Sequence, residues 1–407
     1  MEQKPELTVV LVDAFQNCVP ENLGAVPGRK LLLVGDTHHG NTPLRTMLEY
    51  ARQELFDRII LTHDPHHLHW FAEAGIAPTA YIPNVNCAYF PQRFIEQRQK
   101  TIGFVGQTEN RWLRRRYLLQ AIKDAGLPLI VREAPAAMAA AMYNSIQVTF
   151  NCSLNGDLNM RVFEVMAAGG FLLTDRLSPQ AGLERLFRRG VDYADYEDLD
   201  DLLSKLRHYL AHPDECRKIA RAGQKAYLKR HTPRQRVKDL LEFVYGKSIA
   251  LPYNNDLRVI HRGDKFGENL VERVCLYEFF QSVARQNESV IVVADAAIGA
   301  RTIADLVDLP RLKIKVTEPA EPSHIKKSLS GLGVLNQIEF IEAQQADADI
   351  QLVHASTIAG LPNSQSLRAQ TLAVMTAGTS LDSQTKWLVS QGFSKFSETP
   401  YVFQRVH

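Results

Sequence analysis

The 407-residue chain has few cysteines, almost no net charge and no long apolar run. Its five cysteines are scattered, odd in number and form no Cys-x-x-Cys pair, which argues against a disulfide framework or a zinc finger and fits a reducing compartment. A net charge of +2 gives no sign of a nucleic-acid or membrane-surface binder. No run approaches the ~20 apolar residues of a transmembrane helix, and the polar first residues do not resemble a signal peptide. These absences predict a cytoplasmic protein with no transmembrane segment and no nucleic-acid partner.

Apolar runs of strand length alternate with helical patterns along almost the whole chain, which predicts an α/β protein with parallel sheets. We divide it into a first block at residues 1–97, a second at 98–247 and a third at 257–407. The polar link before the third block contains Pro252 and two asparagines, which favour a loop.

The periodicity and the turn residues predict the following elements. The first block has strands at Leu7–Val12, Lys30–Val34, Arg58–Leu61 and Thr79–Ile82, and helices at Pro43–Leu55 and His66–Ala74. The second has strands at Thr101–Val105, Leu129–Val131, Ile146–Phe150 and Phe171–Thr174, and helices at Arg111–Ala125, Leu199–Leu210, Asp214–Arg230 and Pro233–Tyr245. The third has strands at Val290–Val293, Lys313–Thr317, Ile338–Ile341, Ile350–His354 and Leu372–Met375, and ends in an antiparallel hairpin.

Residues 151–175 carry most of the functional information. A strand, a polar loop, a helix, the pair Gly169-Gly170 and a second strand follow one another, which is typical of a nucleotide crevice. The helix contains one acid, Glu164, in an otherwise apolar run. A buried acid costs free energy unless it has a partner, and the two hydroxyls of a ribose would supply one. Alternatively, Glu164 caps the helix N-terminus, where the dipole favours negative charge.

The residues of this segment resemble a family signature. They are Arg161, Phe163-Glu164, Met166-Ala167, Gly169-Gly170 and Leu173-Thr174-Asp175. The pattern resembles that of retaining-type GT-B glycosyltransferases, most closely the branch of the spore-coat-maturation glycosyltransferases, over about residues 30–245. The resemblance implies two Rossmann-like domains in GT-B arrangement: an acceptor-side domain at 1–97 and a domain at 98–247 that binds a nucleotide-diphosphate sugar. It further implies that Glu164 holds the ribose and that Gly169 and Gly170 let the backbone approach the ligand.

The chain departs from this family at one position. Many relatives have another glutamate eight residues before the ribose-binding one, near the sugar, where this chain has Gly156. Asn155, Asp157 or Asn159 could replace that glutamate, or catalysis could be impaired.

A phosphate site is predicted where a strand ends at Gly106 and a helix begins near Asn110. A glycine turn, a helix N-terminus and arginines together favour phosphate binding. Arg111, in the first turn, and Arg161, at the start of its own helix, are our candidates for the diphosphate. Arg115 and Arg116 have an alternative role as a solvated basic face.

Six of the thirteen histidines lie in two short segments, at positions 38, 39, 63, 66, 67 and 69. The spacing contains no His-Glu-x-x-His motif, and GT-B enzymes usually need no metal, so we expect none. His38 and His39 follow a strand end and are candidates for acceptor binding or proton transfer, because imidazole titrates near neutral pH. Alternatively, His38 and His39 are only polar residues of a loop, without a functional role. We expect His66, His67 and His69 to be structural.

The third block resembles the class I S-adenosylmethionine-dependent methyltransferase fold in its order of elements. Such enzymes need a glycine-rich turn after the first strand, and here only Gly299 is present. Glu318 fits the ribose-binding acid. We expect a degenerate domain used for packing or assembly rather than one that binds S-adenosylmethionine.

The leading hypothesis is a metal-independent, retaining glycosyltransferase whose acceptor is a glycan, a lipid-linked molecule or a protein. His38, His39 and Asp157 are the catalytic candidates. The donor-binding candidates are Glu164, Arg161, Asn159, Gly106, Arg111, Gly169 and Gly170. One alternative is a non-catalytic nucleotide-sugar or glycan-binding scaffold, and another is a methyltransferase that acts through the third block.

Overall fold

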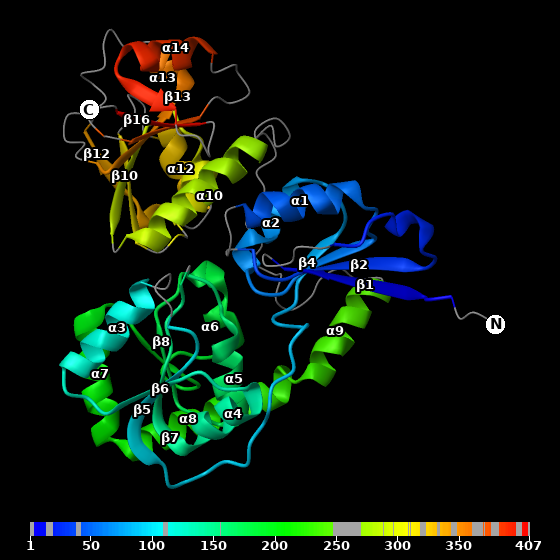
Figure 1. The fold of residues 1–407 in the computed structure, drawn as a ribbon, viewed down its shortest axis with the longest axis vertical. Coiled ribbons are helices and arrows are strands. Elements are labelled where there is room, and N and C mark those ends of the chain that lie inside the picture. Colours follow the sequence, from blue (N-terminus) through cyan, green and yellow to red (C-terminus); the bar gives the residue numbers. More distant parts are fainter. Residues whose placement is uncertain are drawn as a thin grey trace. The chain divides into compact units, whose positions relative to one another are not determined.

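The computed structural model describes most of the chain (Figure 1). The described residues are 4–13, 19–37, 42–108, 113–154, 156–246, 270–287, 289–295, 297–307, 309, 311–317, 323–331, 334–342, 348–359, 369, 371–375, 382–395 and 401–405. By its contacts the chain divides into two compact units. Unit 1 contains residues 1–37, 54–68 and 77–255, and unit 2 contains residues 38–53, 69–76 and 256–407.

Unit 1 begins with a small parallel sheet whose four strands follow one another in space as in sequence. Its strands are β1 (Leu7–Val12), β2 (Arg29–Val34), β3 (Arg58–Leu61) and β4 (Thr79–Tyr81), and short 3-10 turns form η1 (Leu23–Ala25) and η2 (Pro65–His67). The register places Val9 beside Leu31 and Leu33 beside Ile60. Leu31, Leu33 and Ile60 therefore line one face of the sheet, because paired residues of neighbouring strands point to the same side.

This face is covered by the last helix of unit 1, α9 (Pro233–Tyr245). Leu240, Phe243 and Val244 of α9 pack into one core with Leu31 and Ile60. Thr232 caps the helix by accepting a hydrogen bond from the Gln235 N–H, and Pro233 occupies the first turn, where its missing N–H costs nothing.

The second sheet of unit 1 is a five-stranded parallel sheet with the order β6-β5-β7-β8-β9. The strands are β5 (Gln99–Val105), β6 (Leu129–Arg132), β7 (Ile146–Phe150), β8 (Leu172–Asp175) and β9 (Ala194–Tyr196). The helices are α3 (Leu113–Asp124), α4 (Ala136–Ser145), α5 (Met160–Ala168), α6 (Leu183–Leu186), α7 (Leu199–Ala211) and α8 (Pro213–Arg230), with the 3-10 turn η3 (Pro179–Ala181). Helices α3 and α7 cover one face and α4 and α5 the other (Figure 1).

Unit 2 is built on a seven-stranded sheet with the order β12-β11-β10-β13-β14-β16-β15. The strands are β10 (Val290–Ala294), β11 (Leu312–Thr317), β12 (Glu339–Ile341), β13 (Ile350–His354), β14 (Thr371–Met375), β15 (Phe393–Lys395) and β16 (Val402–Arg405). The helices are α1 (Pro43–Gln53), α2 (Leu68–Glu73), α10 (Leu270–Gln286), α11 (Ala300–Val307), α12 (Ser323–Gly331), α13 (Ala355–Ala359) and α14 (Asp382–Ser390), with the 3-10 turn η4 (Leu335–Gln337). All neighbours in this sheet are parallel except the pairs that β16 makes.

Within unit 2, polar contacts hold helices α1 and α2 against helices α10 and α11. The Arg45 N–H donates to Glu278 Oε1 over 3.0 Å. Arg273 binds Glu73 Oε2 at 2.7 Å and Asp305 Oδ2 at 2.6 Å, and Arg301 binds Glu73 Oε1 at 2.8 Å. Buried charges of opposite sign are thus paired between segments that are far apart in sequence.

The predicted strands agree closely with the structure, and β3, β7, β13 and helix α9 have the predicted bounds. The predicted antiparallel hairpin at the end of the chain is confirmed as β15 and β16. The single helix predicted at His66–Ala74 is wrong, because Pro65 opens a 3-10 turn and the α-helix begins only at Leu68. Helix α4 was not predicted. Residues 38–53 and 69–76, which the sequence places in the first block, cluster with residues 256–407, and the three block boundaries stay a prediction.

Candidate functional site

The order of the second sheet marks where a ligand would bind. The chain leaves β5 toward β6 on one side and returns to β7 on the other, so the connections reverse direction between β5 and β7. In open parallel sheets, ligands bind outside the carboxyl ends of the strands at such a reversal. The carboxyl ends of β5 and β7 are therefore the expected centre of a site.

Arg161, in the first turn of α5, bridges these two strand ends. Its Nε donates to the Val105 carbonyl at the end of β5 over 2.9 Å, and its Nη1 donates to Asn151 Oδ1 just after β7 over 2.7 Å. Its guanidinium lies 4.4 Å from the centre of the Phe104 ring. The cation is thereby fixed at the reversal point, beside the positive end of the α5 dipole.

Gly106 makes room for this arginine. It has φ +148°, and a Cβ there would lie 2.4 Å from Arg161 Nη2. Any larger residue would displace the guanidinium, so the predicted role of Gly106 in the turn has a clear steric basis.

A second guanidinium lies on the same ring. Arg115 is buried, lies 5.2 Å from the Phe104 centroid and donates from Nη1 to the Gln107 carbonyl over 2.6 Å. Burial and the neighbouring charge of Arg161 lower the pKa of Arg115. The alternative role of Arg115 in a solvated basic face is wrong, whereas Arg116 is exposed. Two adjacent cations at a strand end favour an anionic ligand.

Glu164 lies beyond the first turn of α5, so the capping role is wrong for it. Its side chain is half-buried, and Oε2 accepts a hydrogen bond from the Tyr143 hydroxyl over 3.2 Å. Burial and the nearby Glu164 charge raise the pKa of Tyr143, although Arg161 opposes this, so the phenol stays a donor at neutral pH. The second carboxylate oxygen has no hydrogen-bond donor among the described residues.

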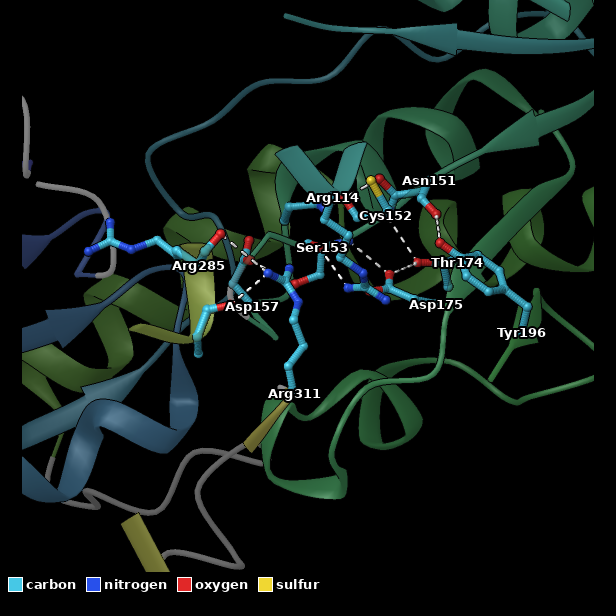
Figure 2. Close-up of polar contacts among 12 residues, drawn as sticks. Arg114, Asn151, Cys152, Ser153, Asp157, Thr174, Asp175, Tyr196, Arg285 and Arg311 are labelled. Carbon is cyan, nitrogen blue, oxygen red and sulfur yellow. Dashed lines mark hydrogen bonds and ion pairs between the residues drawn. The ribbon is translucent and has the colours of Figure 1, made fainter. Parts of the chain in front are cut away.

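Asp175, at the end of β8, organises the polar loop after β7, and Figure 2 shows Arg114 and Ser153 converging on it. Its Oδ1 accepts from the Ser153 N–H over 2.8 Å, and its Oδ2 accepts from Arg114 Nη1 over 2.8 Å. The Arg114 Nη1 also donates to the Ser153 carbonyl over 3.0 Å. Burial lowers the pKa of Arg114, but the Asp175 charge, the hydrogen bond to Asp175 and the nearby Tyr196 and Cys152 together hold that pKa above its usual range.

Asn151 connects this group to Arg161. Its Nδ2 donates to Thr174 Oγ1 over 2.9 Å, and its Oδ1 accepts from both Arg161 and Asn159. The Tyr196 hydroxyl donates to the Asn151 carbonyl over 3.1 Å. The loop after β7 is thus held on all sides by side chains of β8, β9 and α5.

The two described candidates for replacing the missing glutamate, Asp157 and Asn159, differ in their hydrogen bonding. Asp157 is buried, and its Oδ1 accepts from Ser153 Oγ over 2.8 Å. Asn159 is the N-cap residue of α5 but makes no side-chain capping bond. The Asn159 Oδ1 is buried without a hydrogen-bond partner among the described residues. Gly156 itself has φ +77°, a conformation that disfavours a glutamate.

The glycine pair after α5 has structural roles in the described chain. Gly169 has φ +78° and ends α5, with its N–H bonded to the Met166 carbonyl, while the Gly170 N–H reaches the Val165 carbonyl over 2.8 Å. A Cβ on Gly170 would lie 2.8 Å from the Tyr143 carbonyl oxygen. Both glycines lie at the opposite end of α5 from Arg161.

Four of the candidate site residues, His38, His39, Arg111 and Asn155, lie outside the described residues. His67 is buried, and its Nδ1 lies 2.6 Å from Thr37 Oγ1, which donates to Asp64 Oδ2 over 2.9 Å. His69 pairs with Asp305 at 3.0 Å in unit 2. In the described part of the chain, no cluster of histidine, cysteine and acidic side chains could hold a metal ion.

The sequence reasoning missed the part that Arg114, Asn151, Ser153 and Thr174 play in holding the loop after β7. It also missed the contact of Tyr143 with Glu164. A sequence signal exists for Asn151 and Ser153, which are polar residues that follow the buried strand β7. Arg114 and Tyr143 lie within helices and Thr174 within β8, where no such signal marks them. Asp175 was recognised as the end of its strand but given no role. A charge that follows an apolar strand in this way could have suggested the ion pair, but not its partner 61 residues away.

The second unit has its own reversal point, between β10 and β13. After β10, the Ala297 N–H donates to Asp295 Oδ1 over 3.0 Å, and nothing lies within 4 Å of a Cβ placed on Gly299. Glu318 lies outside the described residues.

Comparison with known proteins finds a family match for the part of the chain that contains the second sheet. Residues 93–242 match a family model described as glycosyl transferase-like. This part of the chain is a glycosyltransferase-like domain. It contains the second sheet, its helices and most of α9, and so every residue of the site just described. No curated protein matches the chain.

Several solved structures resemble the chain weakly. TarM matches at 9% identity and a TM-score of 0.43, over 58% of this chain and 54% of TarM. Anabaena HepE in complex with UDP-glucose matches at 13% identity and a TM-score of 0.43, over 55% and 73%. The pneumococcal O-GlcNAc transferase GtfA in complex with UDP and GlcNAc matches at 11% identity and a TM-score of 0.38, over 53% and 52%. This chain thus spans about half the length of TarM and of GtfA, and likenesses at this level say nothing of its activity.

Across the described residues, no helix is both long and apolar enough to cross a membrane.

Proposed function

We propose that the protein is a glycosyltransferase of GT-B arrangement that takes a nucleotide-diphosphate sugar as donor. The observation that carries this proposal is the pair of guanidiniums, Arg161 and Arg115, on Phe104 at the reversal point of a glycosyltransferase-like domain. A diphosphate would neutralise both cations and would lie at the N-terminus of α5.

The donor would lie along the N-terminal half of α5, where successive residues would bind its sugar, its diphosphate and its ribose. Asn159, whose Oδ1 has no hydrogen-bond partner among the described residues, would accept a hydrogen bond from a sugar hydroxyl. Arg161 would bind the diphosphate, and Arg111 remains a second candidate. Glu164, oriented by Tyr143, would accept hydrogen bonds from the two ribose hydroxyls. Gly106 lets Arg161 occupy its place, while Gly169 and Gly170 hold the far end of the helix.

The same residues would promote transfer. As the sugar leaves, negative charge builds on the diphosphate, and fixed cations stabilise it without reorganisation. We propose a metal-independent reaction that retains the anomeric configuration, as the family resemblance implies. Asp157 is already bonded to Ser153 and would act through the loop rather than by free contact with the sugar. His38 and His39 remain the acceptor-side candidates, and the acceptor would be a glycan, a lipid-linked molecule or a protein.

We assign residues 1–97 to the acceptor side, 98–247 to the donor and 257–407 to a degenerate methyltransferase-like domain in a cytoplasmic enzyme. The antiparallel β16 between β14 and β15 supports the methyltransferase-like assignment. The alternative, a scaffold that binds a nucleotide sugar without turnover, is favoured by Gly156 in place of the second glutamate.

A thermal-shift panel tests the donor site. It would compare UDP, GDP, dTDP, CDP and ADP, their common sugars and S-adenosylhomocysteine. A ligand at about a hundred times its Kd should stabilise the protein by roughly 2.7 kcal/mol. We expect one nucleotide diphosphate to raise the Tm and Glu164→Gln to weaken its binding by about 10- to 100-fold, because a hydrogen bond to a charged group is lost.

Glu184→Gln is the matched control, because Glu184 is an exposed acid of α6 outside the site. If a nucleotide sugar binds but its sugar is never cleaved from the nucleotide, the result would support the non-catalytic scaffold. A shift with S-adenosylhomocysteine alone would move the chemistry to residues 257–407, and no shift with any ligand would overturn the donor site.

A further inference from the structure

An apolar stripe on α9 has no place in the donor site. Val237, Leu241 and Tyr245 are 50%, 43% and 46% exposed, and they recur every fourth residue on one side of the helix. They line a shallow hollow of about 750 Å³ together with Arg234, Lys238 and Glu242. A contiguous exposed apolar surface with a charged rim is typical of a protein interface.

The stripe faces toward the edge strand β1. Arg29 of β2 lies 5.1 Å from the Tyr245 ring, whereas Arg58 of β3 lies 5.8 Å from the Phe243 ring on the other flank of the helix. Tyr245 therefore lies on the side of α9 that is nearer to β2 and β1.

Strand β1 extends this apolar surface. Val9 and Leu11 pair with Leu31 and Leu33, which pack beneath α9, so all four point to the same face of the sheet. Yet Val9 is 46% and Leu11 39% exposed. No described strand pairs with the outer edge of β1, whose sequence LTVVLV contains neither a charge nor a proline to protect it.

We propose that this surface, made of β1 and the stripe on α9, is the interface of a two-fold homodimer. Its charges are self-complementary: Lys238 and Glu242 lie one helical turn apart beside the middle of the stripe. When two copies of α9 pack antiparallel, Lys238 of one copy faces Glu242 of the other, twice, around the apolar contact. Neither side chain forms an ion pair in the described part of the chain, so both are available.

The same charges argue against a lipid surface as the partner. Helices that lie on anionic membranes carry basic residues on their polar face, and an acid there costs binding free energy. Glu242 lies within the rim of the stripe itself, which fits a second copy better.

Charge-swap variants test the interface by sedimentation velocity from about 1 to about 100 μM, a range that brackets weak dimers. We expect the wild-type protein to dimerise, and Lys238→Glu and Glu242→Lys each to weaken the dimer at least about tenfold through like-charge contacts. An equimolar mixture of the two variants should recover the dimer, because the acid introduced in one copy then faces the base introduced in the other, and the two unchanged side chains still face each other. Val9→Lys should weaken the wild-type dimer through β1.

All three variants replace exposed side chains, so their Tm at low concentration should match that of the wild-type protein. A wild-type protein that stays monomeric over the whole range, or a mixture that does not recover the dimer, would overturn the proposal. Flotation of the monomer with phosphatidylserine vesicles would assign the surface to a membrane instead.

Discussion

Asp175 and Arg114 form the buried ion pair that holds the loop at the candidate site. The side chain of Asp175 is 4% exposed, and its two oxygens are shared between Arg114 and the Ser153 N–H. Removing one partner of such a pair leaves an uncompensated charge, which costs more free energy than removing both.

We therefore expect Arg114→Met to lower the free energy of unfolding by about 3–5 kcal/mol. The double variant Arg114→Met with Asp175→Asn should recover part of that loss, as measured by chemical denaturation. Arg116→Met is the control, because exposed Arg116 should change stability by no more than about 0.5 kcal/mol. Equal losses for Arg114 and Arg116 would contradict the structural role of the pair.

His231 makes the stability of this unit depend on pH. It is buried against Phe187, at 4.6 Å between ring centres, and next to Arg236. Burial and the Arg236 charge lower the pKa of His231 to about 3, from 6.5. Between these values the unfolded chain binds a proton that the folded chain does not, so stability falls as the pH falls.

The contribution of His231 should reach about 1.4 kcal/mol for each pH unit below about 6.5 and should level off near the folded pKa. Chemical denaturation at several pH values would show a steeper dependence for the wild-type protein than for His231→Gln. The same slope in both proteins would show that His231 is not the group responsible.

At the scale of elements, α5 is the helix on which the proposed donor site depends. Its N-terminal half carries Asn159, Arg161 and Glu164, and its far end is fixed by Gly169 in a left-handed conformation. A Cβ on Gly169 would lie 2.9 Å from Gln224 Nε2, which donates to the Gln92 and Ala167 carbonyls.

Gly169→Ala should destabilise the protein by about 2 kcal/mol through backbone strain and the loss of the Gln224 contacts. Gly24→Ala is the matched control, since no atom lies within 4 Å of a Cβ there and its φ is not positive. Thermal unfolding would compare the two variants with the wild-type protein. If Gly169→Ala unfolds at the same Tm as Gly24→Ala, the left-handed C-cap of α5 does not require glycine.

Elements with a distinct apolar pattern could be predicted from the sequence, and those without one could not. Strands β3, β7 and β13 are short apolar runs between polar residues, so their bounds were clear. Helix α4 is rich in alanine and methionine on all sides, with no apolar face to reveal it. Arg161 and Glu164 were named as candidates from their segment and its family resemblance, and their roles stay predictions. The contacts of Arg114 and Tyr143 were not predicted, because their partners come together only through the packing of distant segments.

At the scale of the whole molecule, residues 256–407 do not form a separate unit. Contacts place α1 and residues 69–76 with them, and Glu73, Arg273 and Arg301 form buried ion pairs between the two segments. Glu73 loses both of its cationic partners if the chain is cut between the two segments.

A fragment of residues 1–246 should therefore keep the cooperative unfolding of unit 1 but be cleaved by protease within α1 and α2, whose partners in unit 2 are missing. The substitution Arg273→Met should destabilise the full chain by about 3–5 kcal/mol, because the buried carboxylates Glu73 and Asp305 each lose one cationic partner. Lys315→Met, which removes an exposed pair with Glu339, is the control. A fragment whose α1 and α2 resist protease as they do in the full chain would contradict this view.

We propose above all that the carboxyl ends of β5 and β7 bind the diphosphate of a nucleotide sugar. Isothermal titration of the protein with a nucleotide diphosphate, its monophosphate and its nucleoside tests this most directly, beside Arg161→Met and Arg161→Lys. We predict that the diphosphate binds at least about tenfold more tightly than the monophosphate and that Arg161→Met removes this difference, with part of it kept by lysine. Equal affinities for the three ligands, or a diphosphate preference that survives Arg161→Met in a folded variant, would contradict the claim.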